Sequence, residues 1–373
     1  MKVLEYLNTL CKQGASSYTA LGILEENYSI KCNLWEDLVC LNYCQINSPK
    51  FYEITKECRS LVLGHRCSNE GGEEFYIVSR SFDRFFNQGE DTNEGYDITE
   101  LTAYEKVDGS LIGVFNHKGK WLYRTRSMIM PDRDMYVNGS NLTWKDLIES
   151  QIEPCDHFMI KDCTYIFEIV SPENRVVTRY PERSAYLLQI RNNISGNYSF
   201  YEYHKEVALL GGWRVPKQYK FDTIENCKEA SKDLRNLEEG YVLYDQYGKP
   251  CIKVKNPSYV AAHHLRGGGQ LSAKRIMDLI FMNEQEEYLS IFSEDSYRFE
   301  PYNQALLLAE DFFNDLSYKF IDIDTQKDFA LKVKDSKVAG LLFMKRKNKR
   351  LTFNDCFNRM TTPAKYRLVE SYL

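Results

Sequence analysis

The chain has 373 residues, which is more than one typical domain, and its 43% hydrophobic and 27% charged residues are the composition of an ordinary folded protein. Its formal net charge of -5 excludes a protein coated in positive charge, so contact with nucleic acid would need a local basic patch. No apolar run approaches the length that spans a membrane, and we predict two domains without a membrane segment.

The N-terminal segment predicts an amphipathic helix, because its apolar residues recur at helical spacing with polar residues between them. Such a helix differs from a signal peptide, which needs a continuous apolar stretch. The apolar residues are Val3, Leu4, Leu7, Leu10 and Cys11.

Eleven cysteines are scattered along the chain without a Cys-x-x-Cys pair. The odd number leaves at least one unpaired, and with the missing signal peptide it suggests reduced thiols in the cytoplasm, or in the host cytoplasm if the protein is viral. Buried free thiols are therefore favoured over a zinc site.

Residues 36–260 predict a mainly antiparallel sheet, because short apolar or alternating runs are separated by turn residues. Helical patterns near residues 142–152 and 224–237 interrupt the strands without regular strand–helix alternation, so the predicted class is α+β. The runs that read most clearly as strands are residues 60–63, 75–78, 121–123, 165–167 and 241–244.

The tetrapeptide Lys106-Val107-Asp108-Gly109 lies between two predicted strands, residues 101–104 and 111–115. Asp-Gly favours a tight turn, and a lysine placed beside a carboxylate and a glycine can act as a nucleophile. The same four residues also fit a hairpin turn with a solvated lysine. Alone, they do not decide between these interpretations.

Glu168 lies in the apolar run of residues 165–170, on the face of Ile166 and Val170. Ionising a carboxylate there is costly without a partner, so we expect a hydroxyl or a cation beside it. The alternative is a glutamate on an edge strand.

Residues 239–244 and 251–255 predict a hairpin. Because side chains alternate along a strand, Lys253 and Lys255 share one face, while Ile252 and Val254 take the core face. A solvated strand face is the alternative. Glu239, at the start of the partner strand, makes a site for an anion and a metal more credible. The chain has no Gly-x-x-x-x-Gly-Lys-[Ser/Thr] loop and no Gly-x-Gly-x-x-Gly fingerprint, so side chains would have to handle any phosphate.

After Pro257 the pattern becomes helical, at residues 271–282, 305–320, 329–344 and 363–373. Thr362-Pro363 predicts an N-cap followed by proline at the first helical position. Gly267-Gly268-Gly269 predicts a flexible joint. We therefore predict a first domain over residues 1–260 and an all-α domain over residues 261–373.

The ordered set of Lys106-Val-Asp-Gly, Phe167-Glu168, Glu239-Gly240-x-Val242 and Lys253-x-Lys255 resembles the motif series of the covalent nucleotidyltransferases, which include ATP-dependent ligases and messenger-RNA capping enzymes. Residues 41–43, 57–60 and 79–87 narrow the resemblance to the RNA ligase 1 type of the T-even phages. It covers about residues 40–263. It implies an ATP-grasp-like ligase domain with a mainly antiparallel sheet. The helical domain that follows is outside the resemblance, and only the order of the domains implies that it selects the RNA.

The resemblance implies three steps that join an RNA 3′-hydroxyl to a 5′-phosphate. Lys106 takes AMP from ATP, AMP passes to the RNA 5′-phosphate, and the 3′-hydroxyl displaces AMP. An ordinary lysine is protonated near neutral pH, so we expect neighbouring cations and a divalent metal, Mg²⁺ or Mn²⁺, to favour its neutral form. Lys253 and Lys255 would supply that bias and neutralise the α-phosphate.

The resemblance also implies roles for other residues. Glu168 matches the ribose-binding glutamate and Glu239 a metal ligand, whereas Asp108 either contacts the metal or orients its loop. Tyr259 lies where the family has a tyrosine tied to RNA sealing. The ATP-binding set is Tyr43, Arg59, Arg84, Lys106, Arg126, Glu168, Lys253 and Lys255.

The chain departs from the family pattern in three places. Arg84 stands where the family has lysine, Ser60 replaces the usual glycine after Arg59, and Arg124-Thr125-Arg126 replaces a Lys-x-Lys pair. Arginine keeps the charge and can bind phosphate through two hydrogen bonds.

The basic run of residues 345–350 fits either a solvated helix end or a contact with RNA phosphates. The expected partners are RNA ends, for example those of cleaved transfer RNA, and a separate end-healing kinase or phosphatase, since the chain has no phosphate loop. A DNA ligase or capping enzyme should continue into a β-barrel, and an RNA ligase 2 usually has histidine where Asp108 stands. A catalytically silent RNA-binding module would not need the full set of motifs.

Overall fold

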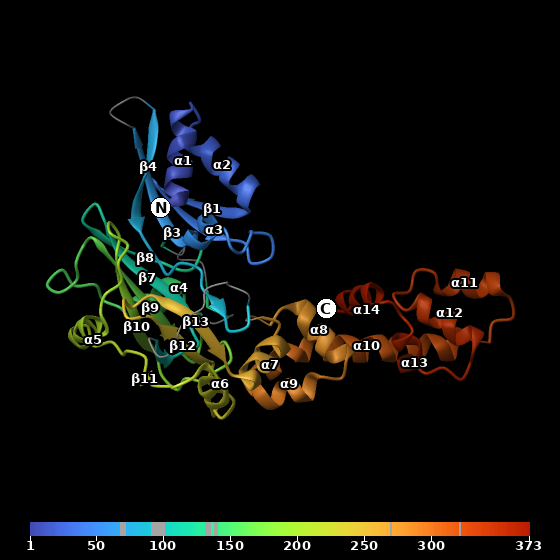
Figure 1. The fold of residues 1–373 in the computed structure, drawn as a ribbon. Helices are drawn as coiled ribbons and strands as arrows, with labels where there is room; N and C mark the ends of the chain where they lie inside the picture. Colours follow the sequence, from blue (N-terminus) through green and yellow to red (C-terminus); the bar gives the residue numbers. More distant parts are fainter. Residues whose placement is uncertain (68–71, 91–100, 131–135, 138–140, 269–270, 321) are drawn as a thin grey trace. The chain divides into compact units, whose positions relative to one another are not determined.

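The computed structural model describes residues 1–373 except 68–71, 91–100, 131–135, 138–140, 269–270 and 321 (Figure 1). The chain divides into two compact units, Met1–His263 and His264–Leu373. The first unit combines helices with mainly antiparallel sheets, and the described part of the second unit is helical, which confirms the predicted α+β class with a helical C-terminal part.

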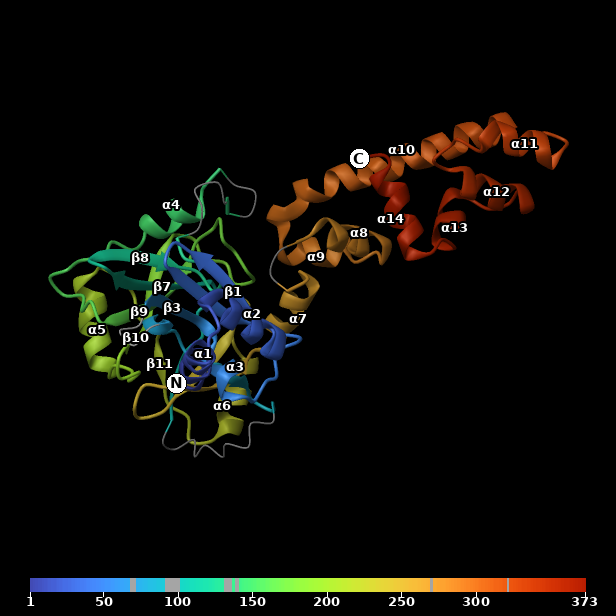
Figure 2. The same cartoon turned by 90° about the horizontal axis from the view of Figure 1, so that it is seen from above.

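The first sheet has the strand order β1-β2-β3-β4 and is antiparallel throughout. α1 and α2 cover one face of it (Figures 1 and 2). The predicted amphipathic helix is confirmed as α1, which buries Val3, Leu7 and Cys11. The elements of this part are α1 (Lys2–Lys12), α2 (Ser17–Tyr28), β1 (Ile30–Trp35), β2 (Leu38–Tyr43), α3 (Glu53–Glu57), β3 (Arg59–Cys67) and β4 (Glu73–Ser79).

The second sheet has the order β10-β9-β7-β8, and the third has the order β11-β6-β12-β13-β5. Their neighbouring strands are antiparallel, apart from the parallel pair β13 and β5. The elements are β5 (Phe86–Asn87), β6 (Thr102–Glu105), β7 (Ser110–His117), β8 (Lys120–Arg124), α4 (Trp144–Glu149), β9 (Cys163–Val170), β10 (Ser184–Asn192), α5 (Tyr201–Leu210), β11 (Gln218–Tyr219), α6 (Ile224–Lys232), β12 (Gly240–Tyr244) and β13 (Pro250–Lys255).

β9 separates two cores because its side chains alternate between faces. Tyr165 and Phe167 join one buried cluster with residues of α4 and α5. Ile166 belongs to another cluster, together with Val242 and Tyr244 of β12, so this face of the second sheet packs against the third. The candidate catalytic residues lie at the boundary between these two sheets.

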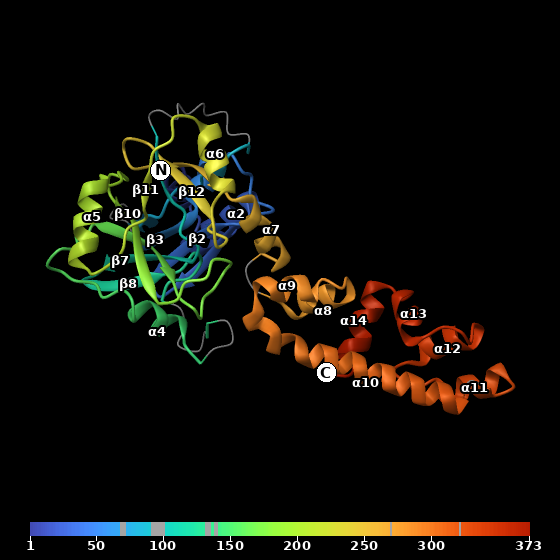
Figure 3. The ribbon, with the colours of Figure 1, turned by 90° about the horizontal axis from the view of Figure 1, so that it is seen from below.

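Helices make up the described secondary structure from residue 264 onward, and α10 runs along this unit (Figure 3). Phe313 of α10 packs in one core with Phe329, Leu342 and Phe353. The elements are α7 (Pro257–Leu265), which crosses the unit boundary, α8 (Ala273–Phe281), α9 (Gln285–Ile291), the 3₁₀ turn Ser293–Asp295, α10 (Ser296–Phe320), α11 (Gln326–Val333), α12 (Ala339–Lys347), α13 (Phe353–Asn358) and α14 (Thr362–Glu370).

Two helix predictions were wrong in detail. The helical pattern over residues 329–344 belongs to two helices, α11 and α12, with a break at residues 334–338. The N-cap of α14 is Thr361, one residue before the predicted Thr362, and its side chain makes no capping hydrogen bond. Proline still fits there, because the first N–H groups of a helix have no partner within the helix.

The joint predicted at residues 267–269 is described only in part. Gly267 and Gly268 have φ angles of 83° and 85°, a conformation that favours glycine. Gly269 lies outside the described residues. No helix in the described ranges has both the length and the apolar character needed to cross a membrane.

Candidate active site

The segment from Lys106 to Gly109 crosses from one sheet to another. β6, which precedes it, belongs to the third sheet, and β7, which follows it, belongs to the second. The tight-turn interpretation is therefore wrong, because Asp-Gly here does not join paired strands. A Cβ atom on Gly109 would lie 2.2 Å from the carbonyl oxygen of Ile169, so close packing requires this glycine.

Lys106 is held from two sides by the start of β12. Its backbone N–H donates to the carbonyl oxygen of Gly240 at 2.9 Å, and its Nζ donates to Oε2 of Glu239 at 2.6 Å. Gly240 has a φ of 136°, and a Cβ atom there would lie 2.1 Å from the carbonyl oxygen of Val254. Glu239 thus places a carboxylate beside Lys106, and the residue after Glu239 has to be glycine because no side chain fits there.

Glu239 lies between two lysines. Its other oxygen, Oε1, accepts from Nζ of Lys255 at 2.9 Å, and its side chain is only 5% exposed. Burial raises the pKa of Glu239, but Lys106 and Lys255 outweigh burial and lower it overall. The carboxylate is therefore ionised and balanced by two ammonium groups.

The pKa of Lys106 differs from our expectation. Burial lowers it, but Glu239, Glu168 and Asp108 raise it, and the net direction is upward. We expected neighbouring cations to lower this pKa. Instead, the carboxylates dominate, because Glu239 lies in direct contact with the ammonium group.

Lys253 has the lowered pKa expected of a lysine among cations. Burial, followed by Arg59, Lys106 and Lys255, holds its pKa well below the usual value. Its Nζ donates to the carbonyl oxygen of Phe85 at 3.0 Å and lies 4.3 Å from the centre of that ring. The opposite face of β13 behaves as predicted, because Val254 is buried and Ile252 packs against the same cluster.

Glu168 lies on an interior strand, since β9 has β10 on one side and β7 on the other. The edge-strand alternative is therefore wrong. Its Oε1 accepts from the backbone N–H of Gly109 at 3.2 Å, whereas we expected a hydroxyl or a cation as partner. Burial raises its pKa to about 8, although Lys106 pulls it downward.

Tyr43, at the end of β2, lies beside two arginines. The guanidinium carbons of Arg84 and Arg126 are 4.2 Å and 5.3 Å from the centre of its ring. Arg59 lies 5.0 Å from the centre of the Phe85 ring, and burial lowers its pKa. Within the described residues, Nη1 of Arg59, Nη1 of Arg84 and Nε of Arg126 are buried without a hydrogen-bond partner. These donors suit an anion.

Ser60 has a φ of 58°, which is the left-handed region. The pairing of β2 with β3 shifts at this point, because Leu41 pairs with Leu61 while Asn42 pairs with Arg59. Ser60 is therefore the extra residue of a bulge, a position that favours glycine. Its Oγ donates to the carbonyl oxygen of Arg126 at 2.7 Å.

Arg124 and Arg126, which replace the Lys-x-Lys pair of the family, lie in different surroundings. Arg126 lines the cavity described below, whereas Arg124 is fully buried and its Nε donates to Ser79 Oγ at 3.3 Å. Burial lowers the pKa of Arg124 to about 10. Its guanidinium carbon would lie 2.4 Å from a Cβ atom on Gly113.

A cavity of about 490 Å³ collects most of the predicted ATP-binding residues, namely Tyr43, Arg59, Lys106, Arg126, Glu168 and Lys253. Its size falls in the range typical of small-molecule sites. Glu239, Lys255, Asp108, Arg84 and Tyr259 are not among its lining residues. The remaining lining residues, which we did not predict, are Gln45, Gly109, Ser110, Leu111, Thr125, Met128 and Trp144.

Asp108 has both carboxylate oxygens in hydrogen bonds. Oδ2 accepts from the backbone N–H groups of Val177 and Thr178 at 2.8 and 2.7 Å, and Oδ1 accepts from the hydroxyl of Tyr259 at 2.7 Å. Its own N–H donates to the hydroxyl of Tyr180 at 3.1 Å. These contacts favour a role in orienting the loop over a role as a metal ligand.

In the described ranges, no group of three or more His, Cys, Asp or Glu side chains is arranged to hold a metal ion. Mg²⁺ commonly uses one or two carboxylates together with substrate phosphates, and Glu239 fits that arrangement. The basic run of residues 345–350 closes α12, where cations complement the helix dipole. Lys345 donates to the carbonyl oxygen of Leu351 at 2.9 Å, and Lys349 pairs with Asp322, which favours the helix-end interpretation.

Residues 57–259, more than half of the chain, match the sequence model of a protein family described as RNA ligase. A protein of Autographa californica nuclear polyhedrosis virus, named as a putative bifunctional polynucleotide kinase/RNA ligase, is 28% identical over an alignment of 361 positions that covers 90% of this chain and 49% of that protein. A protein of Thermovibrio ammonificans, named as an RNA ligase, is 25% identical over 256 residues, with 66% of this chain and 63% of that protein covered.

Among solved structures, an archaeal ATP-dependent RNA ligase aligns with 92% of this chain and 80% of its own, with a TM-score of 0.49 and 12% identity. The chain thus spans about half the length of the viral relative and less than two thirds of the bacterial one.

Proposed function

This chain belongs to the RNA ligase family of the phage RNA ligase 1 type, and we propose that it joins RNA 3′-hydroxyl and 5′-phosphate ends at the expense of ATP. The observation that carries the proposal is the cavity in which Lys106, Glu168, Arg59 and Lys253 meet. A nucleophile, a carboxyl group and cations around one space of this size are the parts that nucleotidyl transfer needs.

In the first step, Nζ of Lys106 attacks the α-phosphorus of ATP, so a P–N bond forms and the P–O bond to pyrophosphate breaks. In the second step, an oxygen of the RNA 5′-phosphate attacks the same phosphorus and releases the lysine. In the third step, the RNA 3′-hydroxyl attacks the 5′-phosphorus, which forms the phosphodiester and releases AMP.

Lys106 must lose a proton before it attacks. Glu239 stabilises the protonated form of Lys106 in the arrangement seen here. We propose that Glu239 also holds the divalent metal, Mg²⁺ or Mn²⁺, which when bound would compensate phosphate charge and compete with the ammonium group for this carboxylate. Lys106 would then be released from its ion pair when the nucleotide arrives.

The cations of the cavity bind the polyphosphate in this proposal. Arg59 and Arg126 offer guanidinium N–H groups that have no partner among the described residues, and Lys253 adds an ammonium group when it is protonated. Arg84, which packs on the ring of Tyr43 as Arg126 does, would reach the same phosphates. Preorganised donors of this kind stabilise charge that develops on the phosphate as pyrophosphate leaves.

Glu168 would bind the ribose. Burial raises its pKa to about 8, so near neutral pH its carboxyl group can take up a proton, donate one hydrogen bond and accept another from ribose hydroxyls. The hydrogen bond from Gly109 fixes one of its oxygens. Tyr259 would act in sealing through its hydrogen bond to Asp108, which orients the loop behind Lys106.

The substrate, its supply and the cellular setting belong to the same proposal. We propose RNA with a 3′-hydroxyl and a 5′-phosphate, such as cleaved transfer RNA, acted on in the cytoplasm, with the helical unit choosing the RNA. The viral relative carries a kinase in its name, but no phosphate loop occurs in these 373 residues. End healing would therefore come from outside them.

Incubation with ATP labelled at the α-phosphate tests the first step. The wild-type chain should carry acid-stable label, and Lys106→Ala should carry none. Lys120→Ala, which removes an exposed lysine of β8, is the matched control and should be labelled as the wild type is. An unlabelled wild type, or label that persists in Lys106→Ala, contradicts the proposal.

Sealing assays separate the alternatives within the family. Single-stranded RNA and nicked transfer RNA should be joined. Joining of nicked duplex alone would instead indicate an enzyme of the RNA ligase 2 type, and RNA binding without any label on Lys106 would indicate a silent binding module.

A further inference from the structure

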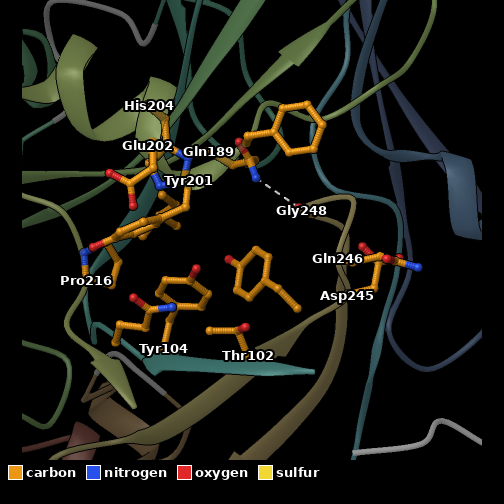
Figure 4. Close-up of a pocket in the computed structure, with 14 residues that line it drawn as sticks. Thr102, Tyr104, Gln189, Tyr201, Glu202, His204, Pro216, Asp245, Gln246 and Gly248 are labelled. Atoms are coloured by element: carbon orange, nitrogen blue, oxygen red, sulfur yellow. Dashed lines mark hydrogen bonds between the residues drawn. The ribbon is translucent and has the colours of Figure 1, made fainter. Parts of the chain in front are cut away.

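A second cavity, of about 260 Å³, shares no lining residue with the cavity at Lys106 (Figure 4). β6 and β12 supply Thr102, Tyr104 and Tyr244, and α5 supplies Tyr201 and His204. Figure 4 shows Asp245 and Gln246 across the open space from Tyr201. Nothing in the proposed mechanism uses this cavity.

Aromatic side chains form one wall of the second cavity. The rings of Tyr104 and Tyr201 are 5.2 Å apart at an angle of 41°, and those of Tyr104 and Tyr244 are 5.1 Å apart at 78°. Phe200, at the entrance to α5, is 70% exposed although it is a large apolar residue. A rigid aromatic wall with one exposed ring at its edge suits a flat ligand that stacks.

His204 gives the second cavity a buried polar group without a partner. Its side chain is only 4% exposed, and its Nδ1 makes no hydrogen bond to any residue that the structure describes. An imidazole nitrogen that stays buried and unpaired costs free energy, which a ligand would recover by bonding to it. Burial lowers the pKa of His204 to about 4, so the ring offers a neutral hydrogen-bonding group at pH 7.

The charged side chains of the second cavity disfavour phosphate as its ligand. Among the described residues that line it, the acidic side chains are Glu202 and Asp245, and none is a lysine or an arginine. A neighbouring depression, which shares Glu202, is lined by Lys205, Arg214 and Lys217 and also by Glu105 and Glu206, so its charges balance. A neutral ring therefore suits the cavity better than a phosphate group does.

The size of the second cavity limits the ligand further. A volume of about 260 Å³ lies below the range for drug-sized ligands, so one flat ring fits and a whole nucleotide chain does not. RNA-binding proteins read unpaired bases by stacking them on aromatic side chains and bonding to their edges.

We propose that the second cavity binds one unpaired nucleobase of the RNA substrate, stacked on Phe200 and Tyr201 and hydrogen-bonded to His204. The proposal rests on the proposed function in that it assigns the base to an RNA that this chain joins. It adds a subsite on the nucleotidyltransferase unit itself, in addition to any contact made by the helical unit.

Fluorescence anisotropy with a single-stranded 5′-phosphorylated oligoribonucleotide, in the absence of ATP, tests the site without requiring catalysis. Phe200→Ala should weaken binding by about tenfold, as expected for the loss of one base–aromatic stack. Leu210→Ala is the matched control, because it removes a 66% exposed apolar residue of the same helix that does not line the cavity. Its affinity should equal that of the wild type.

A set of oligonucleotides, each with one abasic position, identifies the base. One abasic position should weaken binding to the wild type by at least about tenfold, and Phe200→Ala should lose less affinity than the wild type does when that base is removed. His204→Phe, which keeps a ring but removes Nδ1, provides a second variant and should also weaken binding. Unchanged affinity in both Phe200→Ala and His204→Phe overturns the proposal.

Labelling of Lys106 keeps this proposal separate from the ligase proposal. Phe200→Ala should form the lysyl-adenylate as fast as the wild type, because the first step needs no RNA. If the wild type is never labelled, the ligase proposal fails, while the anisotropy experiment still decides whether the second cavity binds a base.

Discussion

Nζ of Lys106 and Oε2 of Glu239 lie 2.6 Å apart, although 133 positions separate the two residues in the sequence. This ion pair joins the end of β6 to the start of β12 and sets the protonation state of the candidate nucleophile. In our proposal, the same carboxylate therefore controls both the charge on Lys106 and the place where a metal would bind.

Glu239→Gln should lower the pKa of Lys106, because the amide no longer stabilises the ammonium group while burial continues to destabilise it. The measurement is the pH dependence of Lys106 acylation, followed by mass spectrometry of the modified peptide. The midpoint should move to lower pH in Glu239→Gln. Glu182→Gln, which breaks a surface pair with Arg214, is the control and should leave the midpoint unchanged. An unchanged midpoint in Glu239→Gln would show that the pair does not govern this lysine.

Glu168→Gln should change how stability depends on pH. The pKa of Glu168 is about 8 in the folded chain and near 4.5 when unperturbed, so between these values the folded state binds the extra proton. The stability of the wild type therefore falls as pH rises from about 4.5 to 8, by at most a few kcal/mol. Thermal unfolding across this range should show a smaller fall for Glu168→Gln. Parallel curves for the two proteins would contradict a raised pKa.

Two substitutions at Ser60 isolate the strain of its left-handed conformation. Ser60→Ala and Ser60→Gly both lose the hydrogen bond to Arg126, but only glycine relieves the positive φ. Ser60→Gly should therefore be more stable than Ser60→Ala by about 1 kcal/mol. Urea unfolding of the two variants measures the difference, and equal midpoints would mean that the bulge relaxes to accept a side chain.

Arg84→Lys should raise the KM for ATP in the adenylation of Lys106 by about three- to tenfold, since lysine keeps the charge but loses planar stacking on Tyr43. The rate at saturating ATP should change little. In a Tyr43→Leu background the same substitution should have a smaller effect, because the stacking partner is already missing. An equal effect in both backgrounds would show that Tyr43 does not position the arginine.

Asp108→Asn should reduce adenylation without moving the midpoint of its Mg²⁺ or Mn²⁺ dependence. The amide cannot replace a carboxylate that accepts two backbone N–H bonds and a tyrosine hydroxyl, so the loop loses its anchor. Glu239→Asp should move the metal midpoint. A shifted midpoint in Asp108→Asn would instead favour metal contact.

Local patterns predicted much of the fold and the chemistry. Alternating side chains on β9 and β13 placed Glu168 and Lys253 on the correct faces, because strand periodicity is a property of the local backbone. Strand pairing is not local. The crossing of residues 106–109 between sheets therefore could not be distinguished from a hairpin turn in the sequence.

The residues that we missed at the candidate site carry no local signal. Trp144 begins a short helix and Met128 lies in a loop, and only the tertiary fold brings them to the cavity of Lys106. The direction of the pKa of Lys106 was also beyond sequence reasoning, since it depends on which charged group lies in direct contact.

Gly113 and Arg124 share one space in the second sheet. They are register partners on β7 and β8, and the space that a side chain at position 113 would occupy is already filled by the guanidinium group. A single substitution that enlarges residue 113 would therefore have to displace the guanidinium group of Arg124. Relatives with a side chain at position 113 should carry a smaller residue at 124, so the two positions should vary together across the family.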